Sequence, residues 1–264
     1  VGNLQRMRRV AWVAGTVSVV GFVVEIAIIV AAAAMQTTSH FNVTTPLHAA
    51  LWSVMAASIV VIWAMSLIVC LALFRNGPGD PARTRAIRSG AVIAIIGMGL
   101  AYLMTAPTAD QLENYQGIVG AHTVGLPDGG PGLPLLGWST VAGDLRIPHF
   151  VGMHALQALP LYVIALEVLA RRWPRLGQVR LRLTTVAVAA YGAGLAVVTW
   201  QALAGQSIVR PAGPVLVAGV VVAVGAIGAF AGVLATARPT GGPVAGDGTA
   251  PTPAVVAGRP GGVV

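Results

Sequence analysis

The stretch from Asp144 to Ala170 reads DLRIPHFVGMHALQALPLYVIALEVLA and decides the fold class of this chain. Most of it is apolar, and it is long enough for a helix that crosses a lipid bilayer, which needs about 20 mainly apolar residues. Its first turns nevertheless carry two histidines and a glutamine, His149, His154 and Gln157. Polar side chains are costly in hydrocarbon, so they usually face the interior of a helix bundle and often serve a site. The stretch therefore predicts a membrane helix that contributes to a functional site.

The composition of the whole chain is typical of an integral membrane protein. Hydrophobic residues make up 56% of the 264 residues and charged residues only 9%, whereas soluble domains carry about 25% charged residues. All sixteen basic residues are arginine, and the formal net charge is +8. These arginines lie at the ends of apolar segments, so we expect a topological role for them and no nucleic-acid partner. The abundance of Ala, Val and Gly indicates a bacterium with a GC-rich genome, and the single cysteine, Cys70, excludes an internal disulfide.

Six apolar stretches reach the length of a bilayer span. They cover residues 10–35, 47–74, 88–107, 148–170, 183–205 and 213–237. The spans are expected to be helices, because membrane barrels show alternating strands of about ten residues and this sequence does not. We therefore predict an all-α integral membrane protein, a six-transmembrane-helix bundle over residues 1–237. Residues 238–264 are rich in Gly, Pro, Ala and Thr and are predicted to form a disordered cytoplasmic tail.

The charges of the connecting loops predict the orientation in the membrane. Loops 75–88 and 171–182 are rich in arginine, whereas loop 36–46 holds no charge and loop 206–212 a single arginine. The long loop 108–147 carries four carboxylates against one arginine. Because positively charged loops remain in the cytoplasm, we expect both termini to be cytoplasmic in a bacterial plasma membrane.

The loop 108–147 is far longer than the usual connection in a compact domain, which indicates either function or disorder. It contains apolar side chains such as Tyr115, Ile118 and Trp138, and a turn-forming run from Gly129 to Pro134. This content favours an ordered extracytoplasmic cap over the helix ends. The alternative is a passive surface loop.

The chain has five histidines, and the topology places all of them on the extracytoplasmic side: His40, His48, His122, His149 and His154. His149 and His154 are about 140° apart around a helix, so one straight helix cannot direct both at a single metal. His154 shares a helix face with Gln157 and lies deeper in the membrane. We therefore expect His154 to point into the bundle and His149 to face the long loop.

A second histidine, His48, opens the second span from the same side, and Trp52 continues its helix face. His48 and His154 can approach each other from different helices, with His122 and His149 closing the site from the loop. Imidazoles placed in this way suit a haem iron or copper, so these four histidines are the predicted metal ligands. The alternative is that each is an interfacial histidine bonded to a loop carbonyl. The predicted ligand-binding side chains are His154, Gln157, Glu25 and Trp52.

Glu25 lies near the middle of the first predicted span. It shares a helix face with Ser18, Gly21 and Ala32, which is expected to turn it towards the other helices. A charged carboxylate is costly in hydrocarbon, so the neutral form is expected there. Such residues commonly serve proton relays or solute paths, and the alternative role is a hydrogen bond that helps helices pack.

The sequence contains no nucleophile elbow, phosphate-binding loop, zinc-protease motif or dinucleotide fingerprint, so a stand-alone hydrolase or transferase is not indicated. The leading hypothesis is binding of a small ligand, or of a metal or haem centre, in the extracytoplasmic half of the bundle. A haem would make the protein an electron carrier. One alternative is a proton-coupled permease for a small solute that uses Glu25. The other is a non-catalytic membrane subunit of a larger complex, and the partners expected are the lipid bilayer and a second copy or another membrane subunit.

Overall fold

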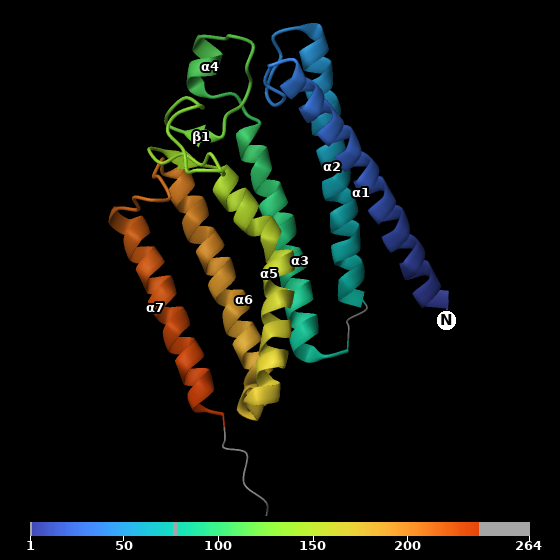
Figure 1. Cartoon of the computed structure of the whole chain (residues 1–264), viewed down its shortest axis with the longest axis vertical. Coiled ribbons are helices and arrows are strands. Elements are labelled where there is room, and N and C mark those ends of the chain that lie inside the picture. The colour runs from blue at the N-terminus through green and yellow to red at the C-terminus, as the bar shows by residue number, and fades with distance from the viewer. Residues whose placement is uncertain (1, 76–78, 238–264) are drawn as a thin grey trace, which may run out of the picture.

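The computed structural model describes residues 2–75 and 79–237, and the predicted tail 238–264 lies outside these residues. Six of its helices are long and apolar enough to cross a membrane (Figure 1). They are α1 (Gly2–Ala34), α2 (Pro46–Arg75), α3 (Pro81–Leu100), α5 (Arg146–Arg172), α6 (Pro174–Leu203) and α7 (Gly213–Ala235). The prediction of six long apolar helices is confirmed, and their composition supports a multi-pass protein in a lipid bilayer.

Three helices, α1, α3 and α6, begin well before the apolar stretches that predicted them, and α1 begins at Gly2 rather than at residue 10. α3 begins at Pro81 rather than at residue 88, and α6 begins at Pro174 rather than at residue 183. Hydropathy detects only the apolar part of a helix, whereas arginine is itself a good helix former. The start of α3 is set by Asp80, whose side chain accepts a hydrogen bond from the backbone N–H of Arg83 at 2.9 Å. Most residues of the two expected arginine-rich loops, 75–88 and 171–182, therefore form the first turns of α3 and α6.

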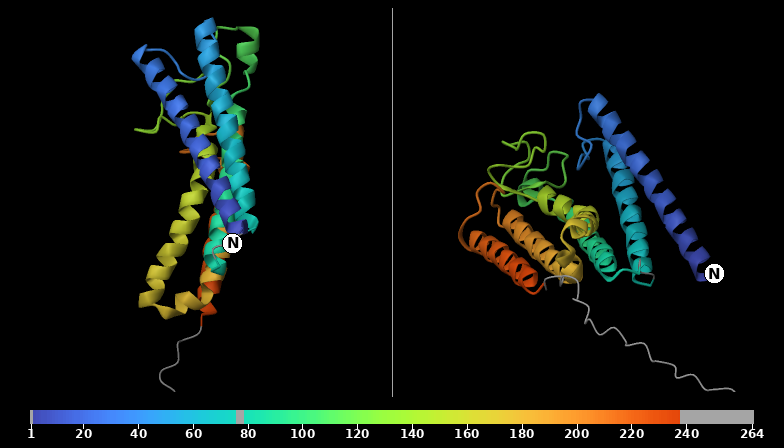
Figure 2. Two further views of the ribbon diagram at one scale, coloured as in Figure 1. Left: turned by 90° about the vertical axis from the view of Figure 1, so that its right-hand side faces the viewer. Right: turned by 60° about the horizontal axis from the view of Figure 1, so that its bottom comes forward.

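The helices follow one another across the molecule, with α3 and α5 in the middle (Figures 1 and 2). α5 packs closely against α3 and α6, and α3 also contacts α6. At the edges, α1 packs on α2 and α7 packs on α6, while α2 links the first pair to α3. Trp63 of α2 makes this link in part by donating a hydrogen bond from Nε1 to the carbonyl of Ile95 on α3 at 3.1 Å.

The central contact between α3 and α5 depends on glycines. Gly97 and Gly152 face each other so closely that a Cβ on either one would overlap the backbone of the other. Two turns further along, Gly90 lies against the backbone of Ala155. Small residues allow helix backbones to approach in this way, and close van der Waals packing is a main source of helix association in a membrane.

Four side chains tie the arginine-rich ends of α3, α5 and α6 together. Arg83 of α3 donates two hydrogen bonds to the carboxylate of Glu167 on α5, at 2.8 and 2.6 Å. Arg180 of α6 donates to the same carboxylate at 3.0 Å and also pairs with Asp80. The ion-pair network thus connects three consecutive long helices at one end of the molecule.

At the opposite end, the segment 105–145, called the long loop below, is folded against the helix ends (Figure 1). A short 3-10 helix, η1 (Ala101–Met104), leads into it from α3. It contains α4 (Ala109–Glu113) and two short antiparallel strands, β1 (Thr123–Val124) and β2 (Gly143–Asp144).

The long loop is also bonded to the α1–α2 loop, residues 35–45. Val43 donates its backbone N–H to the carbonyl of Gly117 at 2.7 Å, and Val119 donates to the carbonyl of Phe41 at 2.8 Å. These bonds bring two loops that are distant in sequence side by side, and the candidate site lies between them.

Candidate functional site

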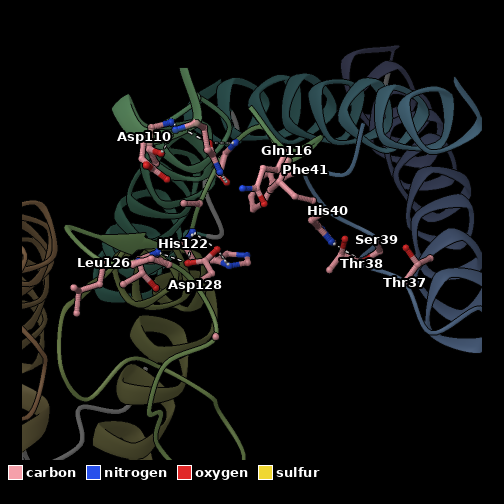
Figure 3. A pocket seen from close by; sticks show the side chains of 18 of the residues that line it. Thr37, Thr38, Ser39, His40, Phe41, Asp110, Gln116, His122, Leu126 and Asp128 are labelled. Atoms are coloured by element: carbon pink, nitrogen blue, oxygen red, sulfur yellow. Dashed lines mark hydrogen bonds and ion pairs between the residues drawn. The ribbon is translucent and has the colours of Figure 1, made fainter. Parts of the chain in front are cut away.

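A pocket of about 1370 Å³ opens between the α1–α2 loop and the long loop (Figure 3). In Figure 3, His40 on the α1–α2 loop lies across the pocket from His122 and Asp128 on the long loop. The wall is mixed in character, with hydroxyl and amide side chains beside apolar ones. Polar members of the wall include Thr38, Ser39, Asp110, Gln111 and Gln116.

Four aromatic rings are grouped at this pocket around Phe41. The ring centroid of Phe41 lies 5.1 Å from that of Trp52 and 5.1 Å from that of His122. His40 contacts the same group, with its centroid 5.7 Å from Trp52 and 6.0 Å from Phe41. Edge-to-face and tilted contacts at these distances stabilise aromatic clusters. The cluster therefore holds the two histidines in place relative to each other.

Phe41 itself has an unusual backbone conformation. Its φ is +61°, in the left-handed region that bulky side chains rarely adopt, and its side chain is buried. Gly120, with φ +118°, lies against the ring of Phe41, and a Cβ there would overlap this ring. Backbone strain of this kind costs free energy and is found preferentially at binding and catalytic sites.

His122 is held by Asp128. The Nδ1 atom of His122 lies 3.0 Å from Oδ2 of Asp128, and the backbone N–H groups of His122 and Thr123 also donate to this carboxylate. Burial acts to raise the pKa of Asp128, but the hydrogen bonds from His122 and Thr123 outweigh it and hold this pKa well below its usual range. Because an ionised carboxylate only accepts hydrogen bonds, Nδ1 carries the proton and Nε2 is the nitrogen left for a ligand.

His40 is fixed through the same ring atom. Its Nδ1 lies 2.9 Å from the hydroxyl oxygen of Ser39. Burial lowers the pKa of His40, and the nearby His122 lowers it further. His40 is therefore a neutral imidazole at pH 7, able to donate or accept one further hydrogen bond at Nε2.

The α5 histidines predicted from the sequence have other contacts. Nδ1 of His149 lies 2.8 Å from the carbonyl oxygen of Gly97, so this ring joins α5 to α3. His154 is exposed, stacks on Phe150 with centroids 3.9 Å apart, and bonds to the carbonyl of the same residue at 2.8 Å. Gln157 is exposed as well. The expected inward orientation of His154 and Gln157 is therefore wrong, because the face of α5 that packs on its neighbours is the one carrying Gly152 and Ala155.

The remaining predicted residues lie in three places. Trp52 and His122 belong to the aromatic cluster of the pocket, whereas His48 bonds to the hydroxyls of Thr44 and Thr45 at the start of α2, both at 3.1 Å. Glu25 is half-buried on α1. Within residues 2–75 and 79–237, no group of three or more His, Cys, Asp or Glu side chains is placed to hold a metal ion. The four predicted metal ligands are therefore not brought together as one such group.

Sequence reasoning missed His40 and Phe41 as members of the site. The available signal was the run Ser39-His40-Phe41 in a short uncharged loop next to a span that carries Trp52. Nothing in the local sequence shows that this loop pairs with the long loop. Comparison with protein-family models, with curated proteins and with solved structures finds no match to this chain.

Proposed function

We propose that this membrane protein binds a small, uncharged ligand with a planar or apolar body in the pocket between His40 and His122. The observation that carries the proposal is the arrangement of these two imidazoles around Phe41. Each is held through Nδ1, by Ser39 and by Asp128, and each keeps Nε2 for a further hydrogen bond. A few fixed polar groups beside an aromatic surface are typical of small-molecule sites.

The charges in the wall favour an uncharged ligand. The described residues that line the pocket include two aspartates, Asp110 and Asp128, and no arginine. An anionic ligand would thus lack a permanent countercharge. The carboxylate of Asp128 is already saturated by His122 and Thr123, so it does not attract a cation strongly. Hydrogen bonds and aromatic stacking remain as the main sources of affinity.

His122→Gln and His40→Gln should each weaken binding of a planar uncharged compound about tenfold, the cost of losing one well-placed buried hydrogen bond. Compounds are first found by a thermal-shift screen on the detergent-purified protein, and their affinity is then measured from the fluorescence of Trp52 and the other tryptophans. Because the pKa of His40 is lowered, His40 stays neutral down to about pH 6.5, the ordinary histidine value. The contribution of His40 to binding should therefore be constant from pH 8 to this value and be lost at lower pH, as His40 takes up a proton.

The matched control is His154→Gln, which changes an exposed histidine outside the pocket and should leave affinity unchanged. Loss of binding in His154→Gln with retention in His40→Gln would contradict the proposal and favour a site on α5. An absorption spectrum and metal analysis of the same preparation test the haem or copper hypothesis directly. A Soret band that persists in His122→Gln would also overturn the pocket as the functional centre.

A second candidate, a proton-coupled permease, is favoured by the position of Glu25. Ile29 and Ala33 of α1 line the pocket, and Glu25 lies one helical turn further along the same face. The distance along the helix axis from Ile29 to Glu25 is about 6 Å. A solute path from the pocket into the membrane would thus meet this carboxyl first.

Glu25→Gln should leave abundance unchanged but abolish coupled proton movement, because glutamine keeps the hydrogen-bonding capacity and cannot carry a proton. The measurement is proton flux into proteoliposomes, followed with a pH-sensitive dye after addition of a compound from the screen. Ser18→Ala, two turns away on the same helix, is the control. Unchanged flux in Glu25→Gln would reject the permease and leave the binding proposal intact.

A further inference from the structure

A second pocket, of about 680 Å³, lies at the arginine-rich end of the molecule. Phe74 at the end of α2, one face of α3, and Val188 of α6 form its walls. It is therefore far from the His40–His122 pocket, at the opposite ends of the helices.

The α3 face in this second pocket changes from polar to apolar along the helix. Arg88 and Ser89 are adjacent, and each lies three or four residues from both Arg85 and Val92, which places the four residues on one side of α3. Arg85 is exposed at the end of this row, and Val92 lies about 10 Å further into the apolar part of the helix. Beside Val92, the wall continues with Val188 and Phe74.

Arg88 is held in a fixed position. Its Nε donates to the carbonyl of Leu73 at 3.0 Å and its Nη2 to the carbonyl of Phe74 at 2.8 Å. Its guanidinium carbon lies 5.4 Å from the centre of the Phe74 ring. These contacts join the end of α2 to α3, so the pocket wall is built by well-defined side chains.

Within the described part of the chain, Arg85 and Arg88, the two arginines of this pocket, are not paired with carboxylates as the nearby arginines are. Arg83 and Arg180 are paired with Glu167, and Arg180 also pairs with Asp80. No carboxylate among the described residues forms an ion pair with Arg85 or Arg88. The pocket therefore keeps two positive charges close to an apolar wall.

From this combination we infer that the pocket binds the headgroup of an anionic phospholipid. Arg85 and Arg88 are placed to bind the phosphate, with the hydroxyls of Thr84 and Ser89 as further donors. An acyl chain would lie along Val92 and its apolar neighbours. Basic pockets between membrane helices commonly bind lipids in this way, whereas a free phosphate would gain nothing from the apolar wall.

The test compares Arg85→Gln with Arg175→Gln in the purified full chain. Both substitutions remove one exposed arginine, but only Arg85 lines the pocket. Dioleoylphosphatidylglycerol is titrated into protein in neutral detergent, and bound lipid is counted by native mass spectrometry. Arg85→Gln should weaken binding about fivefold, the effect of one arginine near an anionic lipid, and Arg175→Gln should not change it.

Two further measurements complete the test. Dioleoylphosphatidylcholine, whose headgroup has no net charge, should bind on the order of tenfold more weakly than phosphatidylglycerol. Thr84→Val, which keeps the side-chain volume but removes a donor, should weaken phosphatidylglycerol binding in the same direction as Arg85→Gln. Equal affinity for the two lipids, or equal losses in Arg85→Gln and Arg175→Gln, would overturn the inference. Displacement of the lipid by an excess of inorganic phosphate would show a phosphate site and would overturn it too.

Discussion

Gly97→Leu is expected to remove most of the folded protein from the membrane. Gly97 lies at the closest point between α3 and α5, where an added Cβ would overlap the backbone of Gly152. A leucine there forces the two central helices apart, which also breaks the bond between His149 and the carbonyl of Gly97. Overpacking alone costs about 1–3 kcal/mol, and the lost helix contact adds to it. The effect is measured from the abundance and the size-exclusion profile of the variant fused to a fluorescent protein.

Gly99→Leu is the matched control for this substitution. Gly99 lies two residues further along α3, and nothing lies within 4 Å of a Cβ placed there. The same change of residue should therefore be tolerated, apart from a small gain in helix propensity over glycine. Equal abundance of Gly97→Leu and Gly99→Leu would show that the central contact is not as close as described.

Asp144→Ala is expected to release the long loop from the start of α5. The carboxylate of Asp144 is buried, accepts hydrogen bonds from Arg146 at 2.6 and 3.0 Å, and accepts the backbone N–H of Ser139 at 2.8 Å. Removing one partner of a buried ion pair costs about 3–5 kcal/mol. Because the side chain of Arg146 is 34% exposed, we expect the lower end of this range. Limited proteolysis of the long loop and the thermal unfolding temperature are the measurements.

The same carboxylate should make the fold sensitive to acid. Burial acts to raise the pKa of Asp144, but the hydrogen bonds from Arg146 and Ser139 outweigh it and hold this pKa below its ordinary value. A lowered pKa in the folded state stabilises the fold at pH above the unfolded value, which is about 3.9. This contribution is lost as the pH falls through 3.9 towards the lower folded pKa. Wild type should lose stability over this range more steeply than Asp144→Asn.

Glu113→Gln provides the comparison for the acid experiment, because Glu113 is exposed on α4 of the same loop. Its acid profile should follow that of wild type. A profile for Asp144→Asn identical to that of wild type would refute the assignment of the acid sensitivity to this ion pair.

The spacing of charged residues and of glycines within one helix does not predict which helices they contact. The spacing of Glu167 and Arg171 favours an ion pair within α5, but Glu167 pairs with Arg83 and Arg180 of other helices. Likewise Gly228 and Gly232 match a small-residue packing motif, yet nothing lies within 4 Å of a Cβ at either. The closest helix contact instead joins Gly97 of α3 to Gly152 of α5. Because these glycines lie on different helices, no residue spacing within one helix predicts that they meet.

The sequence by itself determined that the chain has six long apolar helices, because a run of about 20 apolar residues is a local property and the bilayer requires helices to satisfy backbone hydrogen bonds. It also pointed to His122, which lines the pocket, and to Trp52, whose ring packs on Phe41 of the pocket wall. Only the tertiary structure decided the rest of the site. The rotation of α5 is set by Gly152 and Ala155 packing on α3, which leaves His154 exposed. His40 meets His122 only because backbone bonds join the α1–α2 loop to a loop more than seventy residues later in the chain.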